Sequence, residues 1–203
     1  MSSLPPKSTS LPRVPTQIAD TGEFSREERG LLLQMAHQAI ESAFEGQDIS
    51  FEPPTPHLAE PRGVFTTLYL HGELRGCVGY VFPILPVYRA VAETARAAAS
   101  EDSRFTPVCH DEVPQLEVSL SILSALRPVG PDEVQIGQHG LVVSMAGRRG
   151  LLLPQVPVEH HWDRITFLEQ TCRKAGLPLD AWKRGATLEA FTAEVFADSK
   201  VHA

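Results

Sequence analysis

The fold of this chain is decided by residues 63–80, which read GVFTTLYLHGELRGCVGY. Residues 64–70 are rich in the β-branched and aromatic side chains that are typical of strands. His71-Gly72 suits a tight turn, and residues 73–80 lead back as a second strand. We therefore predict a β-hairpin over this stretch.

Helices and a further strand flank the hairpin. A proline in the first turn opens a predicted helix over 86–99. Residues 116–122 (LEVSLSI) alternate between apolar and polar side chains, which indicates a strand with one buried face. Upstream, Ser25 and Glu28 form a capping box ahead of an apolar stripe at helical spacing, so we predict a helix over 25–45.

The order hairpin, helix, strand recurs in the second half of the chain. Residues 140–153 (GLVVSMAGRRGLLL) predict two strands around a turn at 146–149, and a helix over 162–175 and a strand over 188–195 follow. The matching positions lie at offsets that drift from 77 to 72 residues: Gly63 with Gly140, Gly72 with Gly147, Gly76 with Gly150, and Leu116-Glu117 with Leu188-Glu189. An internal duplication accounts for the matches, and the alternative is two modules that arose independently.

Neither unit alone covers its own sheet. We therefore predict an α+β fold in which two β-hairpin/helix/strand units share one antiparallel, barrel-like sheet with helices packed outside. Residues 1–24 are rich in Pro, Ser and Thr without periodicity and predict a disordered N-terminal tail. Residues 25–198 then form a single domain, an ordinary size for a chain of 203 residues.

Composition narrows the class of protein. A hydrophobic content of 42% with 21% charged residues is typical of globular proteins. The net charge of −7 argues against a non-specific nucleic-acid binder, although it leaves room for a local basic patch. Three cysteines without a CxxC pair favour free thiols in a reducing compartment. Because the chain has neither a leader-like apolar segment nor a run long enough to span a bilayer, we expect a cytoplasmic protein away from membranes.

The strongest candidates for a catalytic or binding role lie on the second strand of the first hairpin. Strict alternation along that strand puts Glu73, Arg75 and Cys77 on one face. A guanidinium near a thiol favours the reactive thiolate, and Gly76 and Gly79 leave room for a ligand or another backbone segment. The alternative is that Cys77 is a small buried filler, since free cysteines are among the most buried residues.

The remaining candidates carry weaker signals. Glu117 belongs to the polar face of the predicted strand 116–122, and most such faces are simply solvated. Glu159-His160-His161 has metal-ligand residue types, but adjacent histidines are poor joint ligands for one ion, so we predict no metal site. Cys172 falls among core positions of its helix, and Lys174 near the helix end suits the helix dipole. No sequence motif indicates a particular cofactor.

Several of these segments together resemble the AMMECR1 domain family. LRGCVG at 74–79 looks like its signature hexapeptide, with valine at Val78 where the family often has isoleucine. Further matches are Ser103-Arg104-Phe105-Thr106-Pro107-Val108, Glu117-Val118-Ser119, His139-Gly140-Leu141, Leu152-Leu153-Pro154-Gln155-Val156 and Lys174-Ala175-Gly176-Leu177-Pro178 before Trp182. The resemblance covers about residues 26–197 and implies an α+β fold of two repeated units with a barrel-like sheet.

The resemblance implies partners more readily than a reaction. Bacterial and archaeal members resemble the first component of an AmmeMemoRadiSam set, whose other members are a Memo-like protein and a radical-SAM enzyme. Nucleic-acid modification has been suggested for the family, but its molecular activity is not established.

Two classes of function stay open at this point. In the first, the protein is an enzyme component built around Cys77, where Arg75 stabilises the thiolate or holds an anionic group and Glu117 supplies a polar or acid/base contact. The candidate ligand-binding residues are Gly76, Gly79, Gln155, His160, Cys172 and Lys174. In the second, the protein is a non-catalytic binding or adaptor module for a protein, peptide or nucleic-acid partner, in which Arg75 contacts the ligand and Cys77 only packs.

Overall fold

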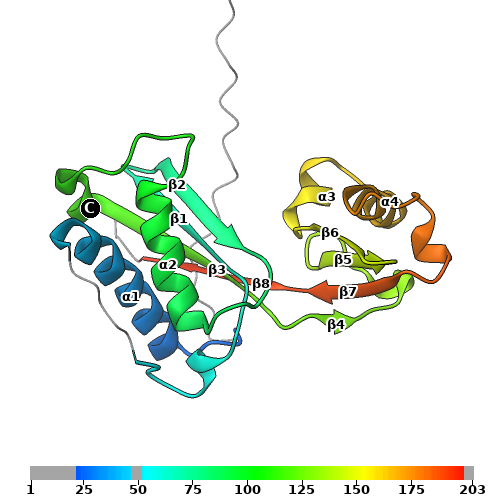
Figure 1. Cartoon of the computed structure of the whole chain (residues 1–203), viewed down its shortest axis with the longest axis horizontal. Coiled ribbons are helices and arrows are strands. Elements are labelled where there is room, and N and C mark those ends of the chain that lie inside the picture. The colour runs from blue at the N-terminus through cyan, green and yellow to red at the C-terminus, as the bar shows by residue number, and fades with distance from the viewer. Residues whose placement is uncertain (1–21, 47–51, 199–203) are drawn as a thin grey trace, which may run out of the picture.

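The strands of this protein form two four-stranded antiparallel sheets, ordered β2-β1-β3-β8 and β4-β7-β5-β6. The computed structural model describes residues 22–46 and 52–198. Each sheet and its helices form one lobe, and the two lobes lie side by side in Figure 1. The first lobe is made of the described residues up to 123 together with 193–198, and the second lobe is made of residues 124–192.

The elements of the first lobe are α1 (Arg26–Glu45), β1 (Val64–Leu70), β2 (Glu73–Tyr80), α2 (Val87–Ser100), β3 (Leu116–Leu123) and β8 (Ala193–Ala197). Those of the second lobe are β4 (Arg127–Pro128), β5 (Gly140–Met145), β6 (Arg148–Leu152), α3 (Gln155–Glu159), α4 (Arg164–Lys174) and β7 (Thr187–Phe191). Short 3₁₀ helices, among them η2 (His110–Gln115) and η4 (Ala181–Lys183), complete the connections. In the described part of the chain, no helix combines the length and the apolar character that a membrane crossing needs.

The first helix forms as its end signals predict. The Ser25 side chain accepts from the backbone N–H of Glu28, whose carboxylate accepts in return from the N–H of Ser25 at 3.0 Å, so the capping box is confirmed. Gly46 ends the helix with φ of 65°, a left-handed conformation that suits glycine. The chain is already packed just before this helix, because Phe24, which we assigned to the tail, is buried. The rest of the predicted tail, residues 1–21, lies outside the described residues.

Both predicted hairpins are confirmed, and they share one turn geometry. His71-Gly72 and Ala146-Gly147 each have two consecutive positive φ values, as a two-residue turn between twisted strands requires. The second turn is therefore shorter than the predicted span 146–149, and its two arginines already belong to β6.

The duplicated units have the same order of strand pairing. In the first unit the hairpin strand β1 pairs with β2 and β3, and in the second unit β5 pairs with β6 and β7. A matched pair of glycines also plays one role in both units. A Cβ on Gly76 would overlap the backbone of Ala98 at the end of α2, and a Cβ on Gly150 would overlap Ala175 just after α4. Each glycine therefore lets the following helix approach the second strand of its hairpin.

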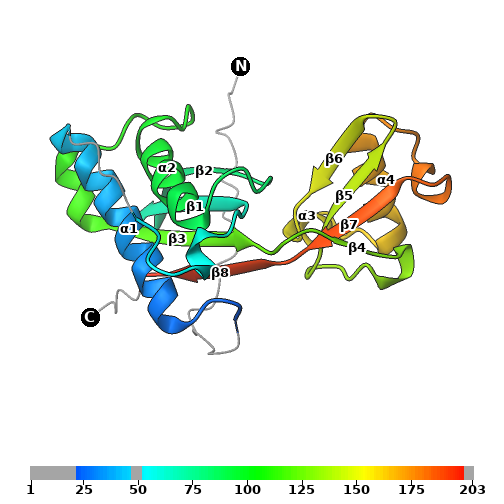
Figure 2. The same ribbon diagram turned by 60° about the horizontal axis from the view of Figure 1, so that its bottom comes forward.

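The prediction of one shared barrel-like sheet is wrong. Each unit keeps its own three strands and receives the fourth from a segment that follows the other unit: β4 pairs with β7, and β8 pairs with β3. The predicted strand over 188–195 is two strands, β7 and β8, which part at Thr192 and enter different sheets. The crossing segments pair with each other, since the N–H of Ser124 donates to the carbonyl of Thr192 at 2.9 Å. Figure 2 shows both running between the lobes.

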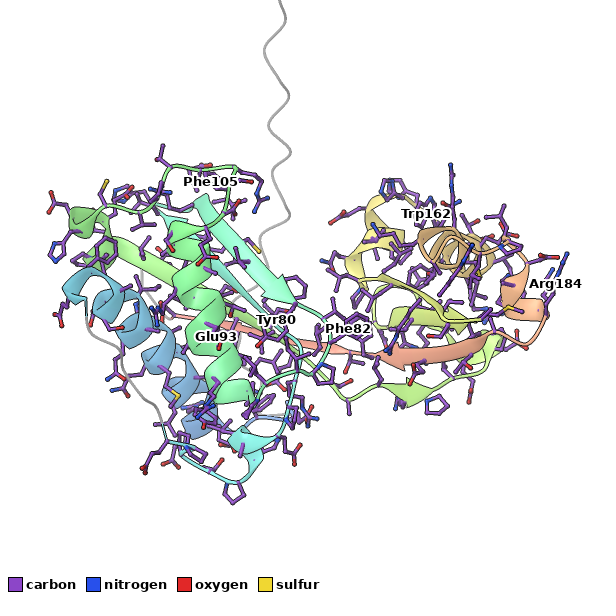
Figure 3. All side chains as sticks on the ribbon, viewed as in Figure 1. Tyr80, Phe82, Glu93, Phe105, Trp162 and Arg184 are labelled. Carbon is purple, nitrogen blue, oxygen red and sulfur yellow. The ribbon has the colours of Figure 1, made fainter. Side chains whose placement is uncertain are left out.

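Three groups of buried apolar residues hold this arrangement together. The first lies between the first sheet and helices α1 and α2, and the second lies between the second sheet and α4. The third joins the lobes around Leu123, Val142 and Phe191, with Phe65 packed against it from β1. The lobes also meet where the Arg149 guanidinium lies 4.4 Å from the centroid of the Phe82 ring, and Figure 3 shows Phe82 on the side of the first lobe that faces the second.

Candidate functional site

Arg75 is the extra residue of a β-bulge in β2. Leu68 pairs with Gly76 while its neighbour Tyr69 pairs with Leu74, so Arg75 has no residue opposite it on β1. A bulge redirects the side chains of its strand. The alternation that placed Glu73, Arg75 and Cys77 on one face therefore breaks at this point.

The Arg75 side chain reaches the connection between α2 and β3. Its Nε and Nη2 donate to the two carboxylate oxygens of Glu112 at 3.0 and 2.9 Å, and its Nη1 and Nη2 donate to the carbonyls of Thr106 and Pro107 at 2.7 and 3.1 Å. Hydrogen bonds from Arg75, and then from the N–H of Cys109, hold the pKa of Glu112 below its ordinary value. Arg75 thus clasps the residues 106–112 to the edge of the sheet.

Cys77 occupies a different environment, two residues further along β2. Its side chain is half-buried, and the hydroxyl of Thr67, its partner on β1, donates to Sγ at 3.2 Å. Its backbone N–H, on the outer edge of the sheet, donates to Oδ2 of Asp102 at 2.8 Å. Arg104 donates to Asp102 through Nε and Nη2 at 2.9 and 2.7 Å, and Nη2 also reaches the carbonyl of Cys77 at 3.4 Å.

The cation that contacts the backbone of Cys77 is Arg104. Hydrogen bonds to Asp102 are the main cause that raises the pKa of Arg104, and negative charge on the Cys77 sulfur adds to it. The same fork from Arg104 holds the pKa of Asp102 far below its ordinary value. For Arg75 the corresponding partners are Glu112 and Cys109. Strand alternation predicted that Arg75 lies beside Cys77, whereas in the structure Arg75 binds Glu112 and Arg104 is the arginine that donates to the Cys77 carbonyl.

At both glycines of the hexapeptide, other atoms of the protein occupy the space that a side chain would take. Gly76 faces the backbone of Ala98, as described above. At Gly79 the ring of its cross-strand partner Phe65 lies where a Cβ would be. We expected a ligand or another backbone segment at these positions. The structure shows backbone at both, that of Ala98 at Gly76 and the carbonyl of Val64 at Gly79, with the Phe65 ring also against Gly79.

Glu117 lies on the same side of the first sheet as Cys77 but two strands away. It pairs with Tyr69 on β1, and two strand spacings put it about 10 Å from β2. The burial of β3 alternates from Leu116 to Leu120, so the predicted polar face of this strand is confirmed. Burial is the main cause that raises the pKa of Tyr69.

These residues belong to a surface that no helix among the described residues covers. Helices α1 and α2 contact the first sheet from the opposite side, as Figure 1 shows. We call this surface the helix-free face; its half-buried or exposed members are Phe65, Thr67, Tyr69, Cys77, Gly79, Glu117, Ser119, Ser121, Val195 and Ala197. Its central row runs from Cys77 through Thr67 to Ser119, so the side chain next to the thiol in this row is polar.

The other four candidates lie in the second lobe, away from the β2 group. Gln155 begins α3, and His160 follows that helix and stacks on Trp162 with ring centroids 4.7 Å apart. Cys172 is fully buried in the second core, where burial raises the pKa of its thiol while the N–H groups of Trp182 and Ala181 bond to the sulfur. Lys174 is the last residue of α4. Among the described residues, no three His, Cys, Asp or Glu side chains form a group fit to hold a metal ion.

Sequence reasoning missed four residues of the Cys77 and Arg75 environment: Thr67, Asp102, Arg104 and Glu112. Arg104 lies within a segment that carries the family resemblance, 103–108, and that was the one available signal. The other three become neighbours only through strand register and the path of the α2–β3 connection.

Comparison with known proteins agrees with this picture. The AMMECR1 family model matches residues 33–196, and the chain belongs to this family. Protein MK0488 of Methanopyrus kandleri is 41% identical over 190 residues, covering 88% of this chain and 92% of that protein. A protein of Aquifex aeolicus is 36% identical over 179 residues, covering 83% and 92%. The crystal structure of the uncharacterized protein PH0010 from Pyrococcus horikoshii has a TM-score of 0.62 and 40% identity, covering 83% of this chain and 90% of that one. None of these names states an activity.

Proposed function

We propose that the protein is an enzyme component whose reactive group is the Cys77 thiol, with its substrate on the helix-free face. The observation that carries the proposal is the hydrogen bond from the Thr67 hydroxyl to a half-buried Sγ, with the Arg104 guanidinium bonded to the backbone carbonyl of the same cysteine. A donated hydrogen bond and a nearby cation both stabilise the thiolate, which is the nucleophilic form of cysteine. A free thiol in this role requires a reducing compartment, which supports a cytoplasmic location.

The chemistry that this arrangement supports is nucleophilic. The thiol proton passes to solvent, the sulfur forms a bond to an electrophilic carbon, and the leaving group departs with the electron pair of the broken bond and takes up a proton. Ser119 and Glu117 lie on the same face and offer polar contacts to the rest of such a substrate.

The test is the rate at which each cysteine is alkylated by iodoacetamide at pH 7, followed peptide by peptide with mass spectrometry. Cys109 is exposed and serves as the internal control, because accessibility alone would make it the faster of the two. We expect Cys77 to react faster than Cys109. Thr67→Val should slow Cys77 about fivefold, the effect of losing about 1 kcal/mol of hydrogen bonding, and leave Cys109 unchanged. If Cys77 reacts no faster than Cys109, the proposal fails.

A second candidate is a binding or adaptor module, and one observation favours it. Arg75, Gly76 and Gly79 all serve contacts within the protein, so much of the hexapeptide builds the surface instead of acting on a substrate. In this case the helix-free face binds a protein partner without any bond being made. The family resemblance suggests a Memo-like protein and a radical-SAM enzyme as partners, and we carry both forward as proposals.

Two substitutions on the helix-free face separate the candidates. Val195 is 44% exposed there and lies far from the thiol chemistry, on β8. Under the binding hypothesis, Val195→Asp prevents co-purification with either partner while Cys77→Ser does not. Under the enzyme hypothesis, Cys77→Ser abolishes the output of the three-protein set even when the partners still co-purify.

A further inference from the structure

Charge is divided unevenly between the two lobes. The second lobe contains eight Arg and Lys residues against seven Asp and Glu, whereas the described part of the first lobe contains seven against sixteen. The acidic balance of the whole chain therefore belongs to the lobe with the helix-free face. The second lobe has enough basic residues to form a positive surface.

Five of these basic residues gather at the end of the second lobe that points away from the first. We call this surface the distal tip; it consists of Arg148, Arg173, Lys174, Lys183 and Arg184, all exposed. Arg148 donates to the carbonyl of Gly176 just beyond α4, and η4 packs against α4, so the three elements meet there. Figure 3 shows Arg184 at the outer end of the lobe.

Acidic residues compensate this charge only in part. Arg184 donates to Asp180 at 2.8 Å and is the one member of the distal tip with a carboxylate partner among the described residues. Glu169 lies one turn before Arg173 on α4. The carboxylates of Asp132 and Glu189 pair with Arg164 and Arg149 elsewhere. The distal tip therefore keeps an excess of positive charge in an acidic protein.

Helix electrostatics explain part of this cluster. Arg173 and Lys174 lie in the last turn of α4, where cations interact favourably with the helix dipole. That account does not extend to Lys183 of η4 or to Arg148 of β6. It also leaves out an apolar side chain in the connection between α4 and η4: Leu179 is 48% exposed, and in η4, which follows, Lys183 lies 4.8 Å from the centroid of the Trp182 ring.

We propose that the distal tip is a docking surface for an acidic protein segment that places an apolar side chain on Leu179. A buried apolar contact with aromatic and arginine residues around it and charges at the rim is the usual composition of a protein interface. Nucleic acid fits less well, because Leu179 offers nothing to a phosphate and the acidic first lobe repels a long polyanion. A second copy would bind its acidic first lobe to this tip in a head-to-tail contact, which builds a closed ring or an open filament, and sedimentation detects either assembly.

The test uses the full chain with Trp162→Phe, so that Trp182 becomes the only tryptophan and reports on the distal tip by fluorescence. Three probes of equal charge are compared at 150 mM salt: a glutamate–leucine peptide, a polyglutamate peptide and a single-stranded oligothymidylate. We expect the glutamate–leucine peptide to bind at least fivefold more tightly than the other two. Leu179→Ser should reduce its affinity to that of polyglutamate.

Charge-reversal variants show whether the tip itself binds. Lys174→Glu with Lys183→Glu should weaken binding of the glutamate–leucine peptide about tenfold or more. The matched control is Arg26→Glu with Arg89→Glu, two exposed residues of the first lobe, which changes the net charge equally and should leave binding unchanged.

Three results would overturn the proposal. Equal weakening by both pairs of variants would mean that only net charge matters. Binding of the oligothymidylate as tight as that of the glutamate–leucine peptide would mean that the tip binds phosphate. Self-association in sedimentation experiments that disappears in the Lys174→Glu, Lys183→Glu protein would assign the surface to a second copy of the chain.

Discussion

The clasp between Arg75 and Glu112 gives the sharpest way to separate a structural from a catalytic role for the hexapeptide. Arg75→Ala removes four hydrogen bonds, two of them to a carboxylate. Hydrogen bonds that involve a charged group contribute about 1.5–3 kcal/mol each in net terms when they are buried. The Glu112 side chain is 24% exposed, so water replaces some of the hydrogen bonds that the substitution removes. We therefore expect a total destabilisation of about 3 kcal/mol.

The assay is urea and thermal unfolding followed by circular dichroism. For a chain of this size each kcal/mol lowers Tm by about 2–4 °C, so Arg75→Ala should lower it by about 6–12 °C. Arg149→Ala is the matched control, because Arg149 holds the equivalent position in the second unit. Its side chain is 41% exposed, with one ion pair to Glu189 at 3.2 Å and the Phe82 ring centroid 4.4 Å away, so the expected loss is about 1 kcal/mol.

A double-mutant cycle with Glu112→Gln isolates the pair. If the clasp is what Arg75 provides, the coupling energy between the two positions exceeds about 1 kcal/mol. Arg75→Lys, which keeps the charge but loses the fork, should fall between wild type and Arg75→Ala. The reasoning is refuted if Arg75→Ala shifts Tm by less than about 2 °C while it slows alkylation of Cys77 as strongly as Arg104→Ala does.

Three further predictions concern other parts of the structure. Glu194→Ala should lower the free energy of unfolding in urea by about 2 kcal/mol, because Glu194 accepts a hydrogen bond from the buried Arg29 at 2.8 Å. The control Val195→Ala, on the exposed side of the same strand, should lower it by less than about 0.5 kcal/mol. His161→Gly should raise the unfolding free energy by up to about 1 kcal/mol, since His161 has φ of 54°, and an unchanged or lower value would contradict this. The depressed pKa of Asp102 means that its stabilisation is present above pH 4 and is lost as the pH falls further, so Asp102→Asn should flatten the acid side of the stability profile.

Local features of the sequence were sufficient to predict the three longer helices and both hairpins, although not the short helix α3. The capping box at Ser25 and Glu28 and the turn at His71-Gly72 are each decided by neighbouring residues, and the structure has both. The division into two sheets depends on Thr192, a β-branched residue in the middle of a continuous strand pattern. Because a strand has the same alternation whichever sheet it enters, no periodicity marks the change of partner.

The candidate site could be predicted only in part, because some of its contacts also depend on residues far apart in the sequence. The hexapeptide was found because its residue types are unusual, and Cys77 does lie half-buried on a helix-free face. The cation was assigned to the wrong neighbour because strict alternation assumes an unbroken ladder, and one extra residue at Arg75 breaks it. Arg104 reaches the backbone carbonyl of Cys77 from 27 residues away, through a connection whose path depends on Asp102 and on the clasp.

Because the two lobes exchange strands, the folding of each lobe depends on the other. The first sheet receives its fourth strand from the residues that follow the second lobe, and through β8 it also receives the Glu194 contact to α1. The second sheet depends in turn on β4, which follows directly from β3. Separating the lobes would remove one strand from each sheet and break the apolar cluster around Phe191 that joins them. Two small sheets with three strands each would then keep exposed edges. For this reason we infer that the region from 25 to 198 folds as one cooperative unit, and that the helix-free face around Cys77 exists only when the second lobe, with its distal tip, is folded as well.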